Sequence, residues 1–278
     1  MINVTEKCIM GRSIVITSGK GGTGKTMFAS NMGALLAMRG KSVVLLDMDL
    51  GLRNLDLYLG LENRIVYNVM DVLSGMCGIG KALIRDKRFK SLYLIAAAPS
   101  RDDRDVTPLH MDVLCRKLKE KFDYVIIDSP AGIGEAFSLA AAGADQAVIV
   151  TEAETASIRD ADQVDRELMK MGIDTRCCVL NKVNAELMAV GAVPSIADIS
   201  RDLRVRLNGI IQYDDNVFIA TNRGVPIVMK QGTYIERNFS RILDRIISDG
   251  DEREKRLGQK AIDERHRAAR KSRDRVGK

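Results

Sequence analysis

The chain has 278 residues and a formal net charge of +6, with 46% hydrophobic, 29% charged and only 4% aromatic residues. This length and composition allow one globular α/β domain, and the few aromatic side chains argue against a nucleic-acid site built on base stacking. The first ten residues lack a basic segment followed by an apolar one, and no apolar run is long enough to span a membrane. We therefore expect a cytoplasmic protein.

Apolar strands and helical segments alternate along the chain. Short apolar or β-branched runs predict strands at 13–18, 42–46, 92–95, 124–127, 147–150, 177–180 and 209–211. Amphipathic helices are expected between most of them, including one from Met27 to Met38 and a last one at 233–247. Such alternation predicts an α/β fold, in which a mostly parallel sheet carries helices on both faces.

The domain organisation follows from the charge distribution. Residues 251–278 hold 11 Lys and Arg against 6 Asp and Glu, which leaves the rest of the chain nearly neutral. We expect one domain over 1–250 and a basic tail over 251–278 that is able to continue as a helix. The tail has few apolar residues and no apolar stripe, so it predicts at most weak, salt-sensitive contact with an anionic membrane.

The cysteines give no sign of a disulfide framework or a metal site. Their number is odd and no CxxC spacing occurs: Cys8, Cys77, Cys115, Cys177 and Cys178. We interpret all five as reduced thiols, with Cys177 and Cys178 inside a buried strand.

A glycine-rich loop lies between the first strand and the first helix. The segment GKGGTGKT at 19–26 fits the phosphate-binding pattern G-x-x-x-x-G-K-[ST] in the correct context. Its glycines let backbone N–H groups turn toward phosphate oxygens, its second lysine supplies a charge, and its last threonine offers a hydroxyl to Mg²⁺. The alternative is a glycine-rich turn without a ligand. The expected ATP contacts are Gly19, Lys20, Gly21, Gly22, Thr23, Gly24, Lys25, Thr26 and Met27.

Three aspartates follow buried strands. Asp47 and Asp49 end the second strand, and Asp128 ends the run YVIID. Ligands of open α/β sheets bind at the carboxyl ends of the strands, so we expect these acids near the loop. We expect Asp49 to position the attacking water and Asp47 to be a supporting switch residue. Together with Thr26, Asp49 and Asp128 are the predicted Mg²⁺ side chains, although solvated strand-end acids are the alternative for Asp47 and Asp49.

The early lysine in the loop suggests a family. GKGG-x-GKT resembles the deviant Walker A signature of the MinD/ParA superfamily of P-loop ATPases. The resemblance implies that Lys20 crosses a dimer interface to the partner's phosphates, that ATP binding drives homodimerisation, and that Asn181 reads the adenine edge. Met27 departs from the family, where a second Thr or Ser is usual, and Gln212 lies where the family carries a Pro.

Further segments resemble the MinD branch of this family: GLRNLD at 51–56, ENRIVYNVMDVLSG from Glu62, ALIRDKRF from Ala82, DSPAGI at 128–133, SIRDAD at 157–162 and NRGVPIV from Asn222. This resemblance implies a switch that directs placement of the division septum with a MinC-like inhibitor and a MinE- or DivIVA-type topological partner. It also makes Arg159 and Asp160 candidate partner contacts, with ordinary surface charge as the alternative. A flagellar-number regulator, a ParA-like partitioning ATPase and a nucleotide-binding scaffold with little turnover remain alternatives.

Overall fold

The structure is a computed structural model that describes residues 10–51, 53–99 and 105–276, with the backbone only at 257, 258 and 260–276. Within these ranges an eight-stranded sheet has the order β3-β4-β2-β5-β1-β6-β7-β8. All neighbouring strands are parallel except the pair β3 and β4. The strands are β1 (Arg12–Thr17), β2 (Val43–Asp47), β3 (Ile84–Arg85), β4 (Leu92–Ile95), β5 (Tyr124–Asp128), β6 (Gln146–Glu152), β7 (Thr175–Val183) and β8 (Arg206–Gln212).

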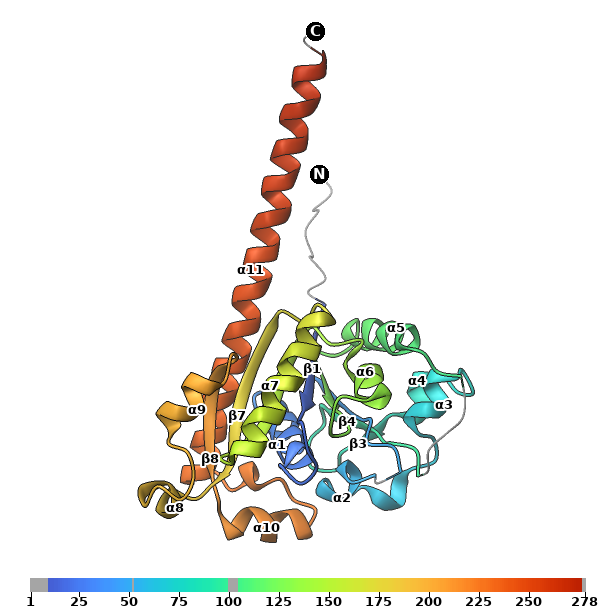
Figure 1. The fold of residues 1–278 in the computed structure, drawn as a ribbon. Helices are drawn as coiled ribbons and strands as arrows, with labels where there is room; N and C mark the ends of the chain where they lie inside the picture. The colour runs from blue at the N-terminus through green and yellow to red at the C-terminus, as the bar shows by residue number, and fades with distance from the viewer. Residues whose placement is uncertain (1–9, 52, 100–104, 277–278) are drawn as a thin grey trace.

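Helices cover both faces of this sheet (Figure 1). The α-helices are α1 (Lys25–Met38), α2 (Leu55–Tyr58), α3 (Val69–Leu73), α4 (Ile79–Ala82), α5 (Pro108–Lys119), α6 (Glu135–Ala141), α7 (Thr155–Lys170), α8 (Ala185–Ala189), α9 (Ile196–Asp202), α10 (Asp215–Asn222) and α11 (Tyr234–Val276). Two 3₁₀ turns, η1 (Glu62–Arg64) and η2 (Ile227–Met229), complete the described elements. The predicted fold class, a mostly parallel sheet with helices on both faces, is confirmed.

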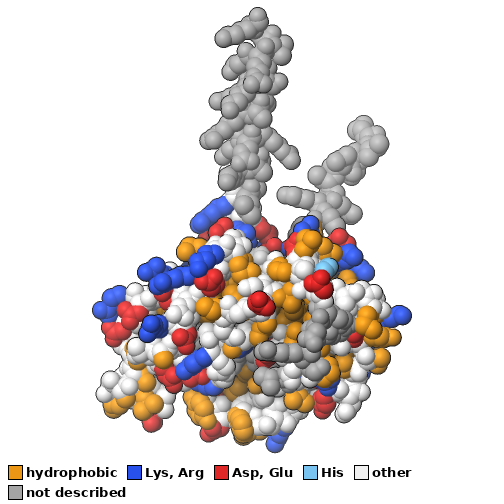
Figure 2. Space-filling view, turned by 45° about the vertical axis from the view of Figure 1, so that its right-hand side comes forward, with side chains coloured by type: hydrophobic (Ala, Val, Ile, Leu, Met, Phe, Trp, Pro, Cys, Tyr) orange, Lys and Arg blue, Asp and Glu red, His pale blue; other side chains and the backbone are white. Residues whose placement is uncertain are grey.

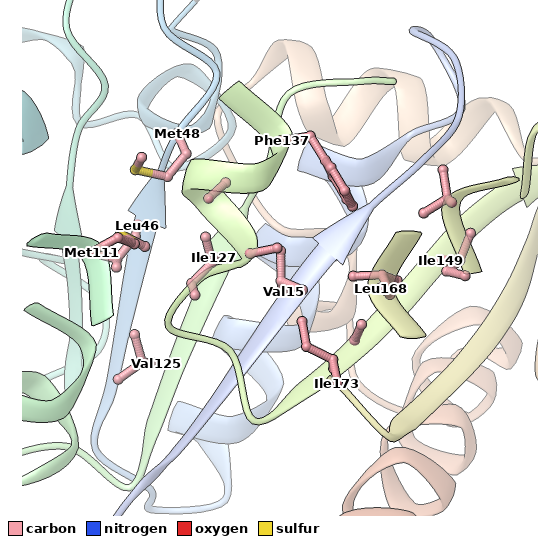
Figure 3. Close-up of a cluster of buried hydrophobic side chains, with 14 of the residues drawn as sticks. Val15, Leu46, Met48, Met111, Val125, Ile127, Phe137, Ile149, Leu168 and Ile173 are labelled. Carbon is pink, nitrogen blue, oxygen red and sulfur yellow. The ribbon is translucent and has the colours of Figure 1, made fainter. Parts of the chain in front are cut away.

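The core has two layers because successive side chains of a strand point to opposite faces of the sheet. In β1, Val15 belongs to the layer under α3, α5, α6 and α7, while Ile14 and Ile16 belong to the layer under α1 and α11. Figure 3 shows the first layer, where Phe137 of α6 and Leu168 of α7 lie over strand residues such as Ile127 and Ile149. Burial on both faces explains why these strands are continuous apolar runs.

Two strands differ from the sequence prediction. The edge strand β3 was not predicted, because its two residues are too few to form a pattern. Strand β7 continues to Val183, whereas we expected it to end at Leu180 and to be followed by Asn181 and Lys182. A register shift lies between Leu180 and Val183, and Lys182 has φ 53°. This bulge-like irregularity keeps two polar residues within a strand.

The last helix is much longer than the predicted 233–247. Helix α11 has 43 residues, a length of about 65 Å, and extends away from the body (Figure 1). Gly250 does not end it. Arg12 at the start of β1 forms ion pairs of 2.7 Å with Asp251 and 2.8 Å with Glu254, and it also donates to the Ile247 carbonyl at 3.1 Å. The helix is therefore fixed at the end of the sheet where the inner strand β1 begins.

The surface charges, the helix apolarity and the cysteines can be compared with the sequence predictions. Basic and acidic side chains lie beside one another over the visible face of the body in Figure 2. None of the helices that the structure describes combines the length and the apolarity that crossing a bilayer requires. Cys77, Cys115, Cys177 and Cys178 are free and buried, which confirms the placement of Cys177 and Cys178 in a buried strand. Cys8 lies outside the described residues.

Candidate nucleotide site

The glycine-rich loop connects the carboxyl end of β1 to the first turn of α1. Gly22 and Gly24 have φ of 83° and 95°, the left-handed region that glycine adopts without strain. Gly24 caps α1, and no side chain among the described residues accepts the first free N–H groups of that helix. A helix start with free N–H groups and a positive dipole end is an anion site. The helix begins at Lys25, two residues before the predicted Met27.

Lys25 is a cation held inside the loop. Its side chain is buried and its Nζ donates to Ser18 Oγ at 2.9 Å. Burial lowers the pKa of Lys25, while the nearby charges of Asp128 and Asp49 raise it. A buried ammonium whose described hydrogen-bond partner is a neutral hydroxyl favours an anionic ligand.

Two of the three predicted aspartates are neighbours in the sheet. Asp47 and Asp128 are paired in register at the ends of β2 and β5, and both are buried. Asp47 accepts the backbone N–H groups of Asp49 at 3.0 Å and Leu55 at 3.1 Å. Burial and the charge of Asp128 raise the pKa of Asp47 well above its usual range. Asp47 thus holds the start of the segment that leads from β2 to α2.

Asp128 lacks the partners that Asp47 has. Neither of its carboxylate oxygens meets hydrogen-bond geometry with a described residue, although the Thr26 side chain is close enough to lower its pKa. Burial outweighs this effect and raises the pKa of Asp128 to about 7. A buried carboxylate with two unpartnered oxygens calls for a cation or a proton.

These residues are suited to bind a magnesium ion together with the phosphates of a nucleotide. The described residues contain no cluster of three or more His, Cys, Asp or Glu that could hold a metal alone. Mg²⁺ in phosphate sites is bound by few protein groups plus water and phosphate oxygens. Thr26 lies beside Asp128, and the half-buried Asp49 lies near Lys25, whose charge lowers its pKa while burial raises it. The predicted hydroxyl and carboxylates therefore gather at one edge of the sheet.

A pocket of about 360 Å³ adjoins the loop. Its lining includes Gly22, Gly24, Met27, Tyr58, Asn181, Lys182, Gln212, Tyr213 and Phe218. Asn181 is buried and its Nδ2 donates to the Thr23 carbonyl at 2.8 Å. The size and the mixed lining suit a planar heterocycle beside a phosphate site. Gln212, at the position where the resemblance expects Pro, faces this same pocket.

Sequence reasoning missed several residues that line the pocket, Tyr58, Lys182 and Phe218 among them. Tyr58 of α2 and Phe218 of α10 line the pocket. Lys182 donates from Nζ to the Gly22 carbonyl at 2.5 Å and pairs with Glu152 at 3.0 Å. Tyr58 and Phe218 come from short helices without a motif, so only the structure brings them together. For Lys182, its place directly after Asn181 was the one available signal.

The early lysine lies on the outer side of the loop. Lys20 Nζ is 2.7 Å from Glu154 Oε2, and its side chain is 38% exposed. The two lysines of the motif thus differ, because Lys25 points into the loop and Lys20 pairs with the residue that precedes α7.

The predicted partner contacts lie on α7. Arg159 is exposed and Asp160 is partly buried. A Cβ atom at Gly19 would lie 2.4 Å from Asp160 Cβ and 2.8 Å from the Asp160 carbonyl carbon. Asp160 therefore lies directly against the phosphate loop, whereas Arg159 is its exposed neighbour on the same helix.

Comparison with known proteins agrees with this geometry. Residues 14–227 match the family described as the CobQ/CobB/MinD/ParA nucleotide binding domain. The septum site-determining protein MinD of Synechocystis sp. is 47% identical over 80% of this chain and 84% of its own length.

Two solved structures are similar as well. MinD in the MinC:MinD cell division protein complex of Aquifex aeolicus is 40% identical, with a TM-score of 0.79 over 86% of this chain and 96% of that one. MinD of Pyrococcus horikoshii, solved with Mg-ADP, is 27% identical, with a TM-score of 0.76 over 85% and 96%. The chain therefore belongs to the CobQ/CobB/MinD/ParA family of nucleotide-binding domains, in its MinD branch.

Proposed function

We propose that the chain is a magnesium-dependent ATPase that acts as a switch in placing the division septum. The observation that carries this proposal is the phosphate loop between β1 and α1, with Lys25 buried inside it and the unpartnered Asp128 beside it. Similarity to septum site-determining proteins over most of the chain supports the cellular role.

Each residue of the site has a distinct role in this proposal. The backbone N–H groups of residues 19–27 and the ammonium of Lys25 bind the phosphates. Thr26, Asp49 and Asp128 would hold the Mg²⁺ shell, and the ion would supply positive charge beside the phosphates. Asp49 orients water, Asp47 fixes the Asp49 segment through its two backbone hydrogen bonds, and Asn181 lies on the base side.

The dimer and its partners follow from the same assignment. ATP binding brings two copies together, and Lys20 of each reaches the phosphates of the other. Arg159 and Asp160, on the helix beside the loop, then lie where a partner senses the nucleotide state. The expected partners are a division inhibitor, as in the MinC:MinD complex of Aquifex aeolicus, and a topological regulator of MinE or DivIVA type.

We assign the ATPase domain to residues 1–250 and a separate role to the tail at 251–278. The tail is helical to Val276 and continues away from the sheet edge where β1 starts. Its basic charge supports a weak peripheral contact with the inner face of the cell membrane, the rest of the protein being cytoplasmic. Nucleic acid is not an expected ligand.

Steady-state ATPase assays test the proposal. The wild-type protein should hydrolyse ATP with Mg²⁺, more quickly with anionic liposomes and a MinE- or DivIVA-type activator. Lys20→Ala should keep ATP binding and lose activated turnover, whereas Asp49→Ala should accumulate as an ATP-bound dimer. Activated turnover in Lys20→Ala at the wild-type rate would contradict the trans role, and turnover stimulated by DNA instead would favour a partitioning ATPase.

A further inference from the structure

Two segments to which the proposed function gives no role, ALIRDKRF from Ala82 and NRGVPIV from Asn222, meet in the folded chain. Arg88 of the first segment donates from Nη1 to the Gly224 carbonyl of the second at 2.8 Å. Its Nη2 donates to the Leu59 carbonyl, also at 2.8 Å. Leu59 directly follows α2, and Gly224 lies just after the end of α10. One guanidinium therefore joins the carboxyl ends of two helices that are far apart in the sequence.

Asp86 fixes the direction of this guanidinium. The Asp86 side chain is 1% exposed, and its Oδ1 and Oδ2 accept Arg88 Nε at 3.1 Å and Nη2 at 2.7 Å. Oδ1 also accepts the backbone N–H of Arg88 at 2.7 Å. A planar guanidinium held by two parallel bonds to a carboxylate cannot turn freely. Asp86 thus aims the remaining N–H groups of Arg88 at the two carbonyls.

The two helix ends also touch each other directly. Gly60 and Gly224 both have φ of 61°, the left-handed region that favours glycine. A Cβ atom at Gly224 would lie 2.9 Å from both Cα and N of Gly60 and 3.0 Å from the Leu57 carbonyl oxygen. The backbones are therefore packed without room for a side chain, and the bonds from Arg88 span this contact.

The same two helices form one wall of the pocket beside the phosphate loop. Tyr58 is the last residue of α2, and α10 contributes Val217, Phe218 and Thr221 to the lining. Figure 1 shows α2 and α10 next to each other on the side of the body away from the chain ends. Arg88 itself lies outside this lining. Any effect of Arg88 on a ligand in the pocket must therefore pass through the positions of α2 and α10.

We propose that Arg88 is a positioning residue for the base of ATP, because it holds α2 and α10 together as the wall against which the base binds. This inference rests on the proposed function, in which the loop binds the phosphates and the pocket takes the base. The bonds from Arg88 reach the base wall and not the phosphate loop. Loss of these bonds should therefore weaken ATP binding and leave the binding of inorganic triphosphate almost unchanged.

Arg88→Lys is the most suitable variant. It keeps a positive charge beside the buried Asp86 but cannot reproduce the fork that contacts both carbonyls. Removing the charge altogether would leave a buried carboxylate without its cation, which is expected to destabilise the fold. Asp86→Asn is the second variant, because it keeps Arg88 and loosens its orientation. Arg64→Lys is the matched control, since the exposed Arg64 donates instead to the Arg85 carbonyl at 2.8 Å.

Two measurements on the full chain test the proposal. Competition against a fluorescent ATP analogue gives the dissociation constants of ATP and of inorganic triphosphate, each with Mg²⁺. Hydrogen exchange of the nucleotide-free protein, followed by mass spectrometry, reports on residues 55–60 and 215–224. A hydrogen bond from a charged donor shifts an equilibrium by about 10- to 100-fold, and only part of this reaches the ligand, so Arg88→Lys should weaken ATP binding by about 3- to 10-fold.

We expect Arg88→Lys to speed exchange in both segments and to lower the preference for ATP over triphosphate. Asp86→Asn should act in the same direction and less strongly, while Arg64→Lys matches wild type. Unchanged exchange in Arg88→Lys would show that Arg88 does not hold the helix ends. ATP and triphosphate weakened equally, or neither weakened, would also overturn the inference while the proposed function stands.

The behaviour of wild type separates this inference from the proposed function. If wild type binds triphosphate only together with a base, the phosphates do not bind independently of the wall, and the division of roles proposed for Arg88 is wrong. If wild type binds neither ATP nor triphosphate, the proposed function fails and this inference falls with it.

Discussion

At the scale of single residues, the site is a set of buried charges that the free protein leaves poorly compensated. Lys25 is buried against a hydroxyl, and Asp128 has no hydrogen-bond partner for either oxygen among the described residues. Burying unpaired charges is unfavourable, so the free protein gives up stability here. Binding of a triphosphate with a cation supplies both missing partners, which links folding stability to the ligand.

The pKa of Asp128 gives a testable pH dependence. Its folded value of about 7 lies above the ordinary value of about 4, so between these pH values the folded protein keeps a proton that the unfolded chain releases. The free energy of unfolding of the ATP-free protein should therefore decrease as pH rises from about 4 to about 7. Asp128→Asn should make this decrease shallower and stabilise the ATP-free protein at pH 8 by on the order of 2 to 4 kcal/mol.

Urea denaturation at pH 5 and pH 8 checks this expectation, with the exposed Asp174→Asn as a control that should match wild type at both values. An Asp128→Asn variant that is less stable than wild type at pH 8 would mean that the carboxylate is well paired in the free protein. The variant should also bind Mg²⁺-ATP less tightly, because it lacks the charge.

At the scale of elements, contact between the phosphate loop and α7 is so close that only glycine fits at position 19. An added Cβ would lie within 3 Å of three atoms of Asp160, two of them backbone. Gly19→Ala should force the loop and the helix apart and destabilise the ATP-free protein by about 1 to 3 kcal/mol.

Gly21→Ala is the matched control for this change. A Cβ at Gly21 meets no atom within 4 Å, so this variant should stay within about 0.5 kcal/mol of wild type. Thermal or urea unfolding of both variants without nucleotide gives the comparison. Equal stabilities would show that the loop and α7 are not in close contact.

The attachment of α11 is the second element-scale feature. Replacing glycine with alanine inside a helix normally stabilises it by about 1 kcal/mol. At Gly250 the new Cβ would lie 2.1 Å from Arg12 Nη1 and displace the guanidinium that binds Asp251 and Glu254. We therefore expect Gly250→Ala to speed hydrogen exchange of the amides of 251–256, measured by mass spectrometry.

Gly258→Ala lies further along the same helix and provides the control, because it should slow that exchange or leave it unchanged. Slower exchange in Gly250→Ala would show that helix propensity outweighs the Arg12 contacts.

Sequence patterns predicted the elements where one local rule applied. Buried parallel strands are continuous apolar runs, and the glycine-rich loop has fixed spacing, so seven strands and the loop were found. A helical tail was expected, but not its continuity with the predicted helix at 233–247, since Gly250 indicates a helix end by local rules while the ion pairs that support the helix there involve Arg12, more than 200 residues away. The sequence analysis placed Asn181 after a strand, because the irregularity in β7 that keeps it within the strand has no local sequence signature.

At the scale of the whole molecule, the phosphate loop and the basic tail lie at opposite ends of the sheet. The loop follows the carboxyl end of β1, whereas α11 leaves the body beside Arg12 at the start of that strand (Figure 1). Residues 251–276 extend about 40 Å as a helix. A membrane contact through the tail would therefore hold the body away from the lipid, with its nucleotide site distant from the surface.

Truncation after Arg256 tests this arrangement, because it keeps the partners of Arg12 and removes 8 basic and 3 acidic residues at 257–278. The truncated protein should lose most of its sedimentation with anionic liposomes at low salt while keeping its ATP affinity. Unchanged sedimentation would mean that the tail is not the contact.

The pocket could not be predicted from local sequence patterns, because it forms only in the folded molecule. Its lining comes from the loop, α2, β7, β8 and α10, which lie far apart in the sequence. The sequence analysis found the phosphate side of the site from one motif, but named only Asn181 on the base side through a resemblance. Tyr58 and Phe218 had no such signal.

The most direct test of the account is isothermal titration calorimetry of the nucleotide-free full-length protein with ATP and Mg²⁺. We predict one ATP per chain, and loss of this binding in Lys25→Ala, whose folded state far-UV circular dichroism should confirm. An absence of Mg²⁺-ATP binding to the folded wild-type protein, or equal affinity in Lys25→Ala, would contradict the account.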